Sequence, residues 1–408
     1  MRRLSGALVS QAVVAGSSLL LQVVALRVLG LADFAVFALL VASALPVATG
    51  VHTSLAGDTL TVLDREDPSV RVVLLRLVWV GAPVVAGVLA LLMVALGYAD
   101  LVAGAVFTLL LLLWMLEDVL RRLLAARREY WRLVAVDATY AGCSVGGALV
   151  LSLASEATVT RLLAVMSAAC LVALLVGLVL LPSREWRGRA SGPGQAARVL
   201  SYGGWRALQV TVRPVALLVL RVVVERRAGP EALGLLEAAR LLAAPAFVLI
   251  NGAGNYLLPG YAARRTAATR EGTDPAPGLL RLADTGVVGL VAAGASLGVV
   301  ALVVTPVLEP LLDVDLDRVS VAAWTAYVVA QAAVLPYALL MAALERPRQV
   351  LLVQAAALGG GTVLACALVL LVPGTAGWSP AVLAGVAVLA APLLRRADRV
   401  FLTGAATD

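Results

Sequence analysis

The chain has 408 residues, of which 62% are hydrophobic and only 14% are charged, far from the balance of a soluble globular domain. Its formal net charge is +7, and all 32 basic residues are arginine. Apolar runs of about 20 residues, the length that crosses the ~30 Å hydrocarbon core of a bilayer, fill nearly the whole sequence and exclude a sizeable soluble domain. We therefore assign the basic charge to lipid headgroups at a membrane surface and expect no nucleic-acid partner.

In chain order, the first half of the sequence contains six apolar runs that predict transmembrane helices. The first run is too long, and too closely followed by the second, to be a signal peptide. The predicted spans are approximately 7–28, 34–57, 72–96, 101–120, 133–154 and 161–181. A polar segment rich in Pro, Ser, Gly and Arg follows at 182–200.

The second half repeats this design with six further apolar runs, approximately 203–224, 234–257, 280–305, 320–343, 350–371 and 378–394. We therefore expect an all-α polytopic membrane protein with about 12 transmembrane helices. The predicted organisation is an N-terminal six-helix lobe over 1–181, a cytoplasmic linker over 182–200 and a C-terminal six-helix lobe over 201–408. Two lobes that start on the same side form a parallel 6+6 repeat, related by an axis along the membrane normal.

A short sequence echo supports the duplication. Each copy places an Arg and a Gly in a short loop after an apolar run, and a Pro inside the next run. Self-similarity at a fixed offset is typical of internal repeats. At a constant offset of 199 residues, Arg27, Gly30 and Pro46 recur as Arg226, Gly229 and Pro245.

The arginines also predict orientation. Most of those outside the spans fall in segments that are cytoplasmic if the N terminus is cytoplasmic, as the positive-inside rule requires. We therefore expect a multi-pass protein of the cytoplasmic membrane with both termini inside. The three cysteines lie singly within apolar runs, which is typical of small buried side chains rather than disulfides: Cys143, Cys170 and Cys366.

Signatures of enzyme chemistry are absent from the sequence. His52 is the only histidine, which excludes a histidine metal cluster, and no nucleophile, zinc or phosphate-loop motif occurs. The predicted outer loops are too short for a catalytic domain, with the acidic segment from Glu309 to Arg318 as a partial exception. We expect no enzyme, no catalytic residue, no metal and no cofactor.

Ionisable groups at membrane depth are the candidate functional residues. Arg206 and Arg213 lie seven residues apart on one face of the seventh predicted span, Gln209 lies between them, and Arg221 falls near the same stripe. Such a ladder suits a phosphate or pyrophosphate, because guanidinium binds these groups bidentately. Snorkelling to the two membrane surfaces would equally explain Arg206 and Arg221, but not Arg213 near the middle of the span.

The eighth predicted span completes the candidate cavity. Glu237 and Arg240 lie three residues apart, and a structural ion pair of Glu237 with Arg240 or Arg221 is favoured over a ligand or proton site. His52 aligns with Asn251 at the offset of 199, although a lone histidine is more often a packing residue. The substrate-binding candidates are Arg206, Gln209, Arg213, Arg221, Glu237, Arg240, His52, Asn251 and Asn255. The hinge candidates, which interrupt predicted helices, are Pro46, Pro214, Pro245 and Pro336.

The remaining acidic residues of the spans are expected to be structural. We predict that Asp137 and Asp284 lie at the membrane interface near cytoplasmic helix ends. Helical spacing predicts that Glu117 and Asp118 pair with the two arginines that follow them, Arg121 and Arg122.

The segment after the first span carries a family resemblance. The sequence Arg27-Val-Leu-Gly30-Leu-Ala-Asp33-Phe34, continued to Phe37, resembles the loop and helix start of Wzx-type polysaccharide flippases in the MATE-like (MOP) exporter superfamily. The chain departs from the pattern at Ala35, and the several arginines that some members carry in their first helices have no counterparts here.

The resemblance implies a two-lobed bundle whose central cavity opens alternately to each side of the membrane. The implied substrate is a polyprenyl-diphosphate-linked sugar or polysaccharide precursor, moved from the inner to the outer leaflet. The partners would then be this lipid-linked oligosaccharide, membrane lipids and proteins of cell-envelope glycan assembly.

Other classes of function stay open at this point. A cation-coupled small-molecule exporter of MATE type would need a cavity carboxylate, for which Glu237 and Asp137 are the candidates. A non-transporting scaffold of cell-envelope assembly would be indifferent to the loss of Arg213. An enzyme acting on lipid-linked sugars would depend on the acidic outer loop, that is, on Asp313, Asp315 or Asp317.

Overall fold

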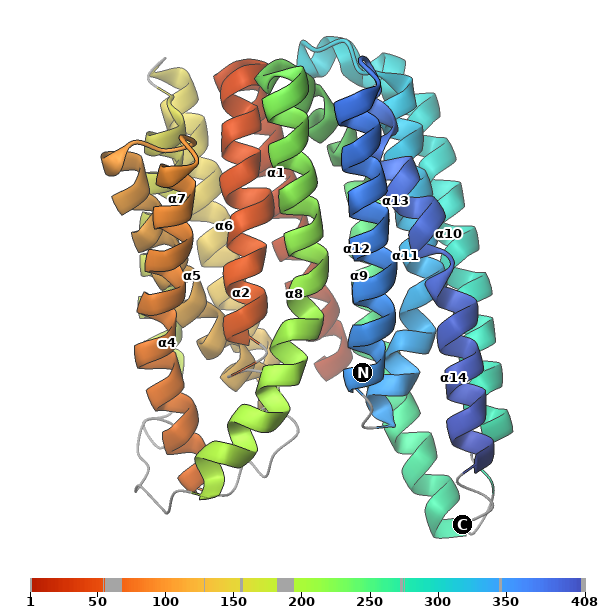
Figure 1. The fold of residues 1–408 in the computed structure, drawn as a ribbon. Coiled ribbons are helices and arrows are strands. Elements are labelled where there is room, and N and C mark those ends of the chain that lie inside the picture. Colours follow the sequence, from red (N-terminus) through yellow and green to blue (C-terminus); the bar gives the residue numbers. More distant parts are fainter. Residues whose placement is uncertain are drawn as a thin grey trace. The chain divides into compact units, whose positions relative to one another are not determined.

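The computed structural model describes residues 2–53, 55, 68–127, 129–154, 157–181, 194–271, 274, 276–344 and 347–404. All the regular elements in these ranges are helices (Figure 1). The chain divides into two compact units, Met1–Leu218 (unit 1) and Val219–Asp408 (unit 2). Most of the predicted linker at 182–200 lies outside the described residues, so the predicted lobe boundary stays a prediction.

Unit 1 is built from the helices up to the middle of α8. They are α1 (Arg2–Leu39), the π-helical turn η1 (Leu40–Ala44), α2 (Leu45–Thr53), α4 (Pro68–Ala95), α5 (Leu101–Ala126), α6 (Tyr130–Leu153), α7 (Val159–Leu180) and α8 (Gly194–Ala228). The helix α1 packs along α6, while α5 and α6 both pack on α7. The contact of α1 with α6 joins residues more than 100 positions apart in sequence, such as Ser10 and Asp137.

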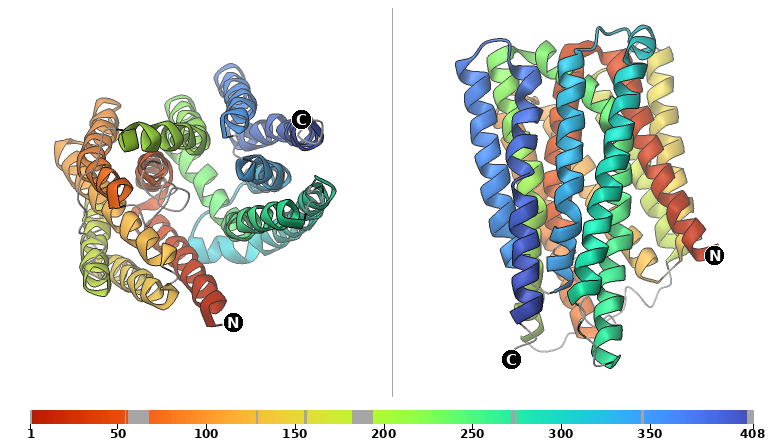
Figure 2. Two further views of the ribbon diagram at one scale, coloured as in Figure 1. Left: turned by 90° about the horizontal axis from the view of Figure 1, so that it is seen from below. Right: turned by 90° about the vertical axis from the view of Figure 1, so that its right-hand side faces the viewer.

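Unit 2 is arranged around α11, which packs against α9, α10 and α13 (Figure 2). Its helices after α8 are α9 (Pro230–Glu271), α10 (Ala276–Leu312), α11 (Arg318–Ala343), α12 (Pro347–Leu371), the 3-10 turn η4 (Ala376–Trp378), α13 (Ser379–Ala387) and α14 (Ala390–Gly404). The central place of α11 explains why its large aromatic residues Trp324 and Tyr327 are fully buried.

Eleven helical stretches of the described chain are long and apolar enough to cross a membrane. The first of them, Val9–His52, has 44 residues, about twice the length that one crossing requires. Gly30 interrupts it with non-helical torsion angles of φ 73° and ψ 174° and so separates two spans. The protein is therefore an all-α polytopic membrane protein with about 12 transmembrane helices, as the sequence predicts.

The two glycines of the sequence echo both have a positive φ. Gly229 separates α8 from α9 with φ 92°, and Gly30 separates the first two spans with φ 73°. Both values lie in the left-handed region, which glycine enters at no steric cost. The echo therefore marks the same structural event, a sharp break between two apolar helices, once in each unit.

The hinge candidates all lie within helices, and their role as hinges stays a prediction. Pro46 directly follows the π-helical turn η1, in which the Leu45 amide donates to the Leu40 carbonyl five residues back. Such a turn accommodates an irregularity in the backbone ladder. Pro214 lies inside α8, Pro245 inside α9 and Pro336, which is buried, inside α11.

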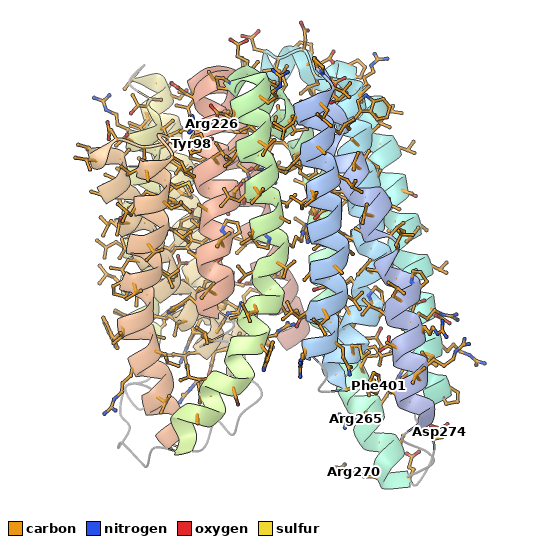
Figure 3. All side chains as sticks on the ribbon, viewed as in Figure 1. Tyr98, Arg226, Arg265, Arg270, Asp274 and Phe401 are labelled. Atoms are coloured by element: carbon orange, nitrogen blue, oxygen red, sulfur yellow. The ribbon has the colours of Figure 1, made fainter. Side chains whose placement is uncertain are left out.

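The polar ends of unit 2 lie on opposite sides of its apolar body. Figure 3 shows Arg226 at one end of this unit and Arg265, Arg270 and Asp274 at the other. This placement agrees with the sequence prediction that the loop at Arg226 and the loop after α9 lie on opposite sides of the membrane. Which side is cytoplasmic stays a prediction.

Candidate functional site

The most concentrated group of buried charges lies in unit 2, where α8 meets α9. The guanidinium of Arg221 binds both carboxylate oxygens of Glu237, with Nε–Oε1 at 2.7 Å and Nη2–Oε2 at 3.0 Å. Arg240 donates from Nε to Oε2 of the same carboxylate at 2.6 Å. The exposed fractions of the Arg221, Glu237 and Arg240 side chains are 2%, 0% and 15%. One carboxylate is thus shared by two arginines, and this triad carries one net positive charge.

Aromatic side chains of α11 fix the position of Arg221. Its Cζ atom lies 6.0 Å from the centre of the Trp324 ring, within the range of a cation–π interaction. The Trp324 indole donates from Nε1 to the Leu236 carbonyl at 2.8 Å. Trp324 and Tyr327 make an edge contact with ring centres 5.7 Å apart, and Phe247 packs on both. The triad is therefore embedded in a rigid, apolar surround.

The predicted arginine ladder is divided between the two units. In unit 1, Arg206 donates from Nη1 to Oε1 of the buried Gln209 at 2.9 Å, and Arg213 is half-buried on the same helix. In unit 2, Arg221 forms the triad, so the snorkelling alternative is wrong for this residue. Of the two pairings weighed for Glu237, both occur at once.

Three further candidates lie on the helices that follow the glycine breaks. His52, in α2, is buried, and within the described part of the chain neither ring nitrogen has a hydrogen-bond partner. Asn251 and Asn255 lie in α9, but their side chains fall outside the described part. Their predicted place in a cavity with His52 stays a prediction.

Asp137 is buried within unit 1, and its predicted depth at the membrane interface stays a prediction. Its carboxylate accepts hydrogen bonds from the Ser10 hydroxyl and from Nε of Arg121, the latter at 2.6 Å. The reason for this burial is the packing of α1 along α6, which covers Asp137 with a neighbouring helix. Glu117 is also buried. Its carboxyl interacts with the Cys170 thiol as well as with Arg121.

Other pairings occur as the helical spacing predicts. Asp118 binds Arg122 at 3.0 Å and approaches Arg121 at 4.0 Å. The cysteines are free thiols, with Cys170 buried, Cys366 half-buried and Cys143 exposed, so burial is wrong for Cys143.

The acidic loop before α11, predicted to be an outer loop, has a structural role at Asp317. Its carboxylate accepts from the Val319 amide and the Ser320 amide, both at 3.0 Å, and from the Ser320 hydroxyl at 2.7 Å. Asp317 is therefore the N-cap of α11, which accounts for this acidic residue without catalysis. Among the described residues, no group of three or more His, Cys, Asp or Glu side chains has the arrangement of a metal site.

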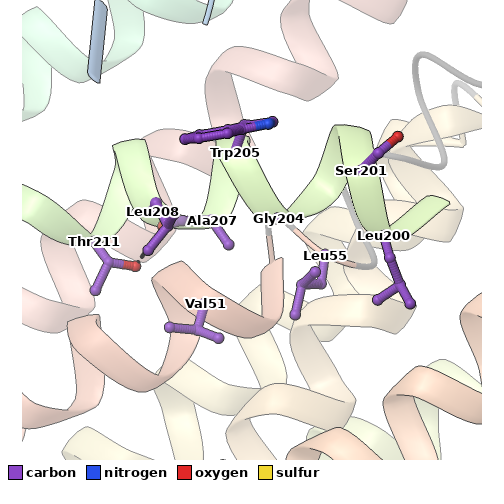
Figure 4. Close-up of a pocket in the computed structure, with 9 residues that line it drawn as sticks. All are labelled: Val51, Leu55, Leu200, Ser201, Gly204, Trp205, Ala207, Leu208 and Thr211. Carbon is purple, nitrogen blue, oxygen red and sulfur yellow. Dashed lines mark hydrogen bonds between the residues drawn. The ribbon is translucent and has the colours of Figure 1, made fainter. Parts of the chain in front are cut away.

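A cavity of about 480 Å³ lies in unit 1 between residues 200–211 of α8 and the end of α2, with Leu55 just beyond that end (Figure 4). Its wall is mainly apolar and includes Val51 and Leu55 on one side and Leu200, Trp205 and Leu208 on the other. Sequence patterns do not reveal this cavity, because it depends on how two helices about 150 residues apart are placed.

Sequence reasoning also missed a polar cluster where α9, α10, α11 and α14 meet, in which Arg395 and Asp284 are partly exposed and Asp398 and Tyr261 are buried. Arg395 binds both oxygens of Asp284 at 2.9 and 2.8 Å, and the Tyr337 hydroxyl donates to the same carboxylate at 2.7 Å. Asp398 and the Tyr261 ring are completely buried nearby, and no described residue forms a hydrogen bond with the Asp398 carboxyl or the Tyr261 hydroxyl. Burial raises the pKa of Tyr261 above its usual range.

Substitution Asp398→Asn is expected to stabilise the protein by about 1 kcal/mol, because a buried carboxyl without a hydrogen-bond partner is costly to bury. Thermal unfolding of the detergent-purified protein measures the change. As a matched control, Asp284→Asn should lower the melting temperature, because it removes the bidentate bond to Arg395. A lower melting temperature for Asp398→Asn would show that the carboxylate is a stabilising group.

Comparisons with known proteins relate the whole chain to one fold. No protein-family model and no curated protein sequence matches it. An inward-facing multidrug resistance MATE transporter of the MOP superfamily has a TM-score of 0.69 at 13% identity, with 98% of both chains covered. An outward-facing MATE transporter of the same superfamily has a TM-score of 0.68 at 12% identity, covering 98% of this chain and 96% of that one.

A third similar structure comes from Pyrococcus furiosus and is described as a MOP superfamily transporter with reversed polarity of its binding pocket. Its TM-score is 0.66 at 14% identity, and the match covers 98% of this chain and 95% of that one. At such low identity the likeness concerns architecture. The chain has the fold of the MATE transporters of the MOP superfamily.

Proposed function

We propose that the protein is a membrane transporter that works by alternating access. The substrate that we propose is a polyprenyl-diphosphate-linked sugar or polysaccharide precursor, moved from the inner to the outer leaflet of the cytoplasmic membrane. The fold supports the first part, because solved structures of this fold include transporters described as inward-facing and outward-facing.

The observation that carries the choice of substrate is the excess of arginine at membrane depth. Arg206 and Arg213 lie half-buried in α8, within the candidate span Val199–Ala228. A cation inside a span is costly and marks a pathway or a binding group. Guanidinium groups bind diphosphates through paired, charge-assisted hydrogen bonds, so these two residues suit an anionic headgroup.

The two carboxylates that were candidates for a cation-binding group support the same choice. Glu237 is held by two arginines, and Asp137 by Arg121 and Ser10. A carboxylate in such a bond is neutralised, which makes it a poor site for an organic cation. We therefore favour an anionic substrate over the cationic substrate of a drug exporter. Proteins of cell-envelope glycan assembly would be the partners of such a transporter.

Arg213→Ala and Arg206→Ala are each expected to weaken binding of a polyprenyl-diphosphate glycolipid about tenfold, the effect of losing one charge-assisted hydrogen bond. Native mass spectrometry of the detergent-purified protein with added glycolipid measures the bound fraction. Arg226→Ala is the matched control, because this side chain is 57% exposed at the end of the same helix. Equal binding by the wild type and both α8 variants would contradict a diphosphate site at these arginines.

A further inference from the structure

The last helix of unit 2, α14, has two contrasting faces. It packs against α10, α11 and α12. Leu394, Asp398 and Leu402 follow one another at intervals of four residues, so they share one helix face, and all three are buried. The other side of the helix carries exposed residues, some cationic and some apolar: Pro392, Leu393, Arg396, Arg399 and Val400. Because α14 belongs to the candidate span Ala376–Leu402, this exposed face is available to membrane lipid.

A hollow of about 390 Å³ lies along the exposed face of α14. Its described lining residues recur at the three- and four-residue intervals of a single helix face, and three of the five are arginines. They are Pro392, Arg395, Arg396, Arg399 and Val400. None of the lining residues that the structure describes is acidic. The hollow therefore combines positive charge with the aliphatic surface of proline, valine and the arginine stems.

Arg395 ties this face to the body of unit 2. Its Nε and Nη2 atoms bind the two oxygens of Asp284 in α10 at 2.9 and 2.8 Å, and the Tyr337 hydroxyl of α11 donates to the same carboxylate at 2.7 Å. The Arg395 side chain is still 43% exposed. The Asp284 carboxylate offsets one of the three arginine charges of the hollow, so two positive charges remain.

The residues that precede the hollow extend it with apolar surface. Leu389 and Leu393 are 59% and 57% exposed, and both come before Arg396 within the candidate span. The intervals of four and three residues place all three on one stripe. Figure 3 shows Phe401, in the following turn, at the end of unit 2 that also carries the labelled arginines of α9. The stripe thus runs from apolar surface inside the span to arginines near its end, the order in which a phospholipid presents its chains and its phosphate.

We propose that this hollow binds the phosphate of an anionic phospholipid. Arg396 and Arg399, three residues apart on the exposed face, contact the phosphate oxygens, since guanidinium groups bind phosphate through charge-assisted hydrogen bonds. The acyl chains lie along Leu389 and Leu393. A soluble anion would use the two arginines but leave these leucines uncovered, which favours lipid as the occupant. Basic pockets at a membrane surface are typical sites for anionic headgroups. The site is independent of the transported substrate.

Native mass spectrometry of the detergent-purified protein tests the site with two lipids that share their acyl chains. They are dioleoyl phosphatidylglycerol, which is anionic, and dioleoyl phosphatidylcholine, which is zwitterionic. The wild type is expected to retain phosphatidylglycerol in preference to phosphatidylcholine. The double substitution Arg396→Gln with Arg399→Gln should weaken binding of phosphatidylglycerol about thirtyfold, the effect of two arginine charges near a headgroup, and leave phosphatidylcholine unchanged.

The matched control is the double substitution Arg226→Gln with Arg227→Gln. It removes the same number of charges from two exposed arginines at the other end of unit 2. The control variant should keep the wild-type preference for phosphatidylglycerol. All four substituted side chains are exposed, so both variants should melt at the wild-type temperature, which shows that they are folded.

Three results would overturn the inference. They are equal retention of the two lipids by the wild type, a wild-type preference in the Arg396 and Arg399 variant, and an equal loss of preference in the control variant. The last would attribute the preference to the net charge of the protein. Inorganic phosphate distinguishes a lipid from a free anion, because it should not displace phosphatidylglycerol at equal concentration. Displacement under that condition would assign the arginines to a soluble anion.

Discussion

Glu237→Gln is expected to lower the free energy of unfolding by about 3–5 kcal/mol, the cost of leaving a buried charge without its partner. The substitution keeps the volume of the side chain and removes only its charge. Arg221, 2% exposed, then loses both of its carboxylate contacts, and Arg240 loses its bond at the same time. The lost energy is therefore electrostatic and not a consequence of a cavity.

Thermal unfolding and the yield of monodisperse protein in detergent measure this effect. Glu225→Gln is the matched control, because Glu225 approaches Arg226 at 3.7 Å and the Arg226 side chain is 57% exposed. A pair this open to its surroundings contributes within about 1 kcal/mol. If Glu237→Gln melted at the wild-type temperature, the triad would not be the stabilising centre of unit 2.

Gly30→Ala and Gly229→Ala are each expected to cost about 1–3 kcal/mol, because a side chain strains a backbone with positive φ. At Gly30 the angles of φ 73° and ψ 174° lie in a region that is essentially confined to glycine. An added Cβ would meet no atom within 4 Å at either position, so the cost comes from the backbone and not from a clash.

The change in melting temperature again provides the measurement, and a neighbouring helix supplies the control. Gly87 lies within α4, where an added Cβ also meets no atom within 4 Å. Gly87→Ala should therefore be neutral or stabilise by up to about 1 kcal/mol through helix propensity. Equal effects at Gly87, Gly30 and Gly229 would mean that the two breaks tolerate any residue and that the echo has no backbone role.

Hydropathy predicts the membrane-crossing parts of this protein well, because each span is a local property of about 20 residues. It does not predict where the helices end. The eighth predicted span covers 234–257, yet α9 continues to Glu271. Beyond the apolar part the helix carries alanine and arginine, both strong helix formers, so it extends past the segment that hydropathy detects.

The candidate site was predictable mainly where its contacts are short-range, with the Arg221–Glu237 pair between two successive helices as the exception. The spacing of Glu237 and Arg240 indicates their bond, and the spacing of Arg206 and Gln209 places them on one face. The burial of Asp137 depends on Ser10, 127 residues away in sequence, and no local pattern reveals such a contact. The apolar cavity and the buried Asp398 were missed for the same reason, since both arise from the packing of distant helices.

The Arg221–Glu237 bond has a consequence for how the two copies of the repeat differ. Its two residues lie eight positions before and eight positions after Gly229. The bond therefore joins α8 to α9 on either side of the turn at this glycine. In the first copy the corresponding residues are Gln22, which donates to Ser18 of its own helix, and Ala38, which is apolar. The second helix pair is therefore joined at this level by a buried ion pair, whereas neither corresponding residue of the first copy is ionisable. The two copies of the repeat thus differ in charge at this level, although their glycine breaks share a positive φ.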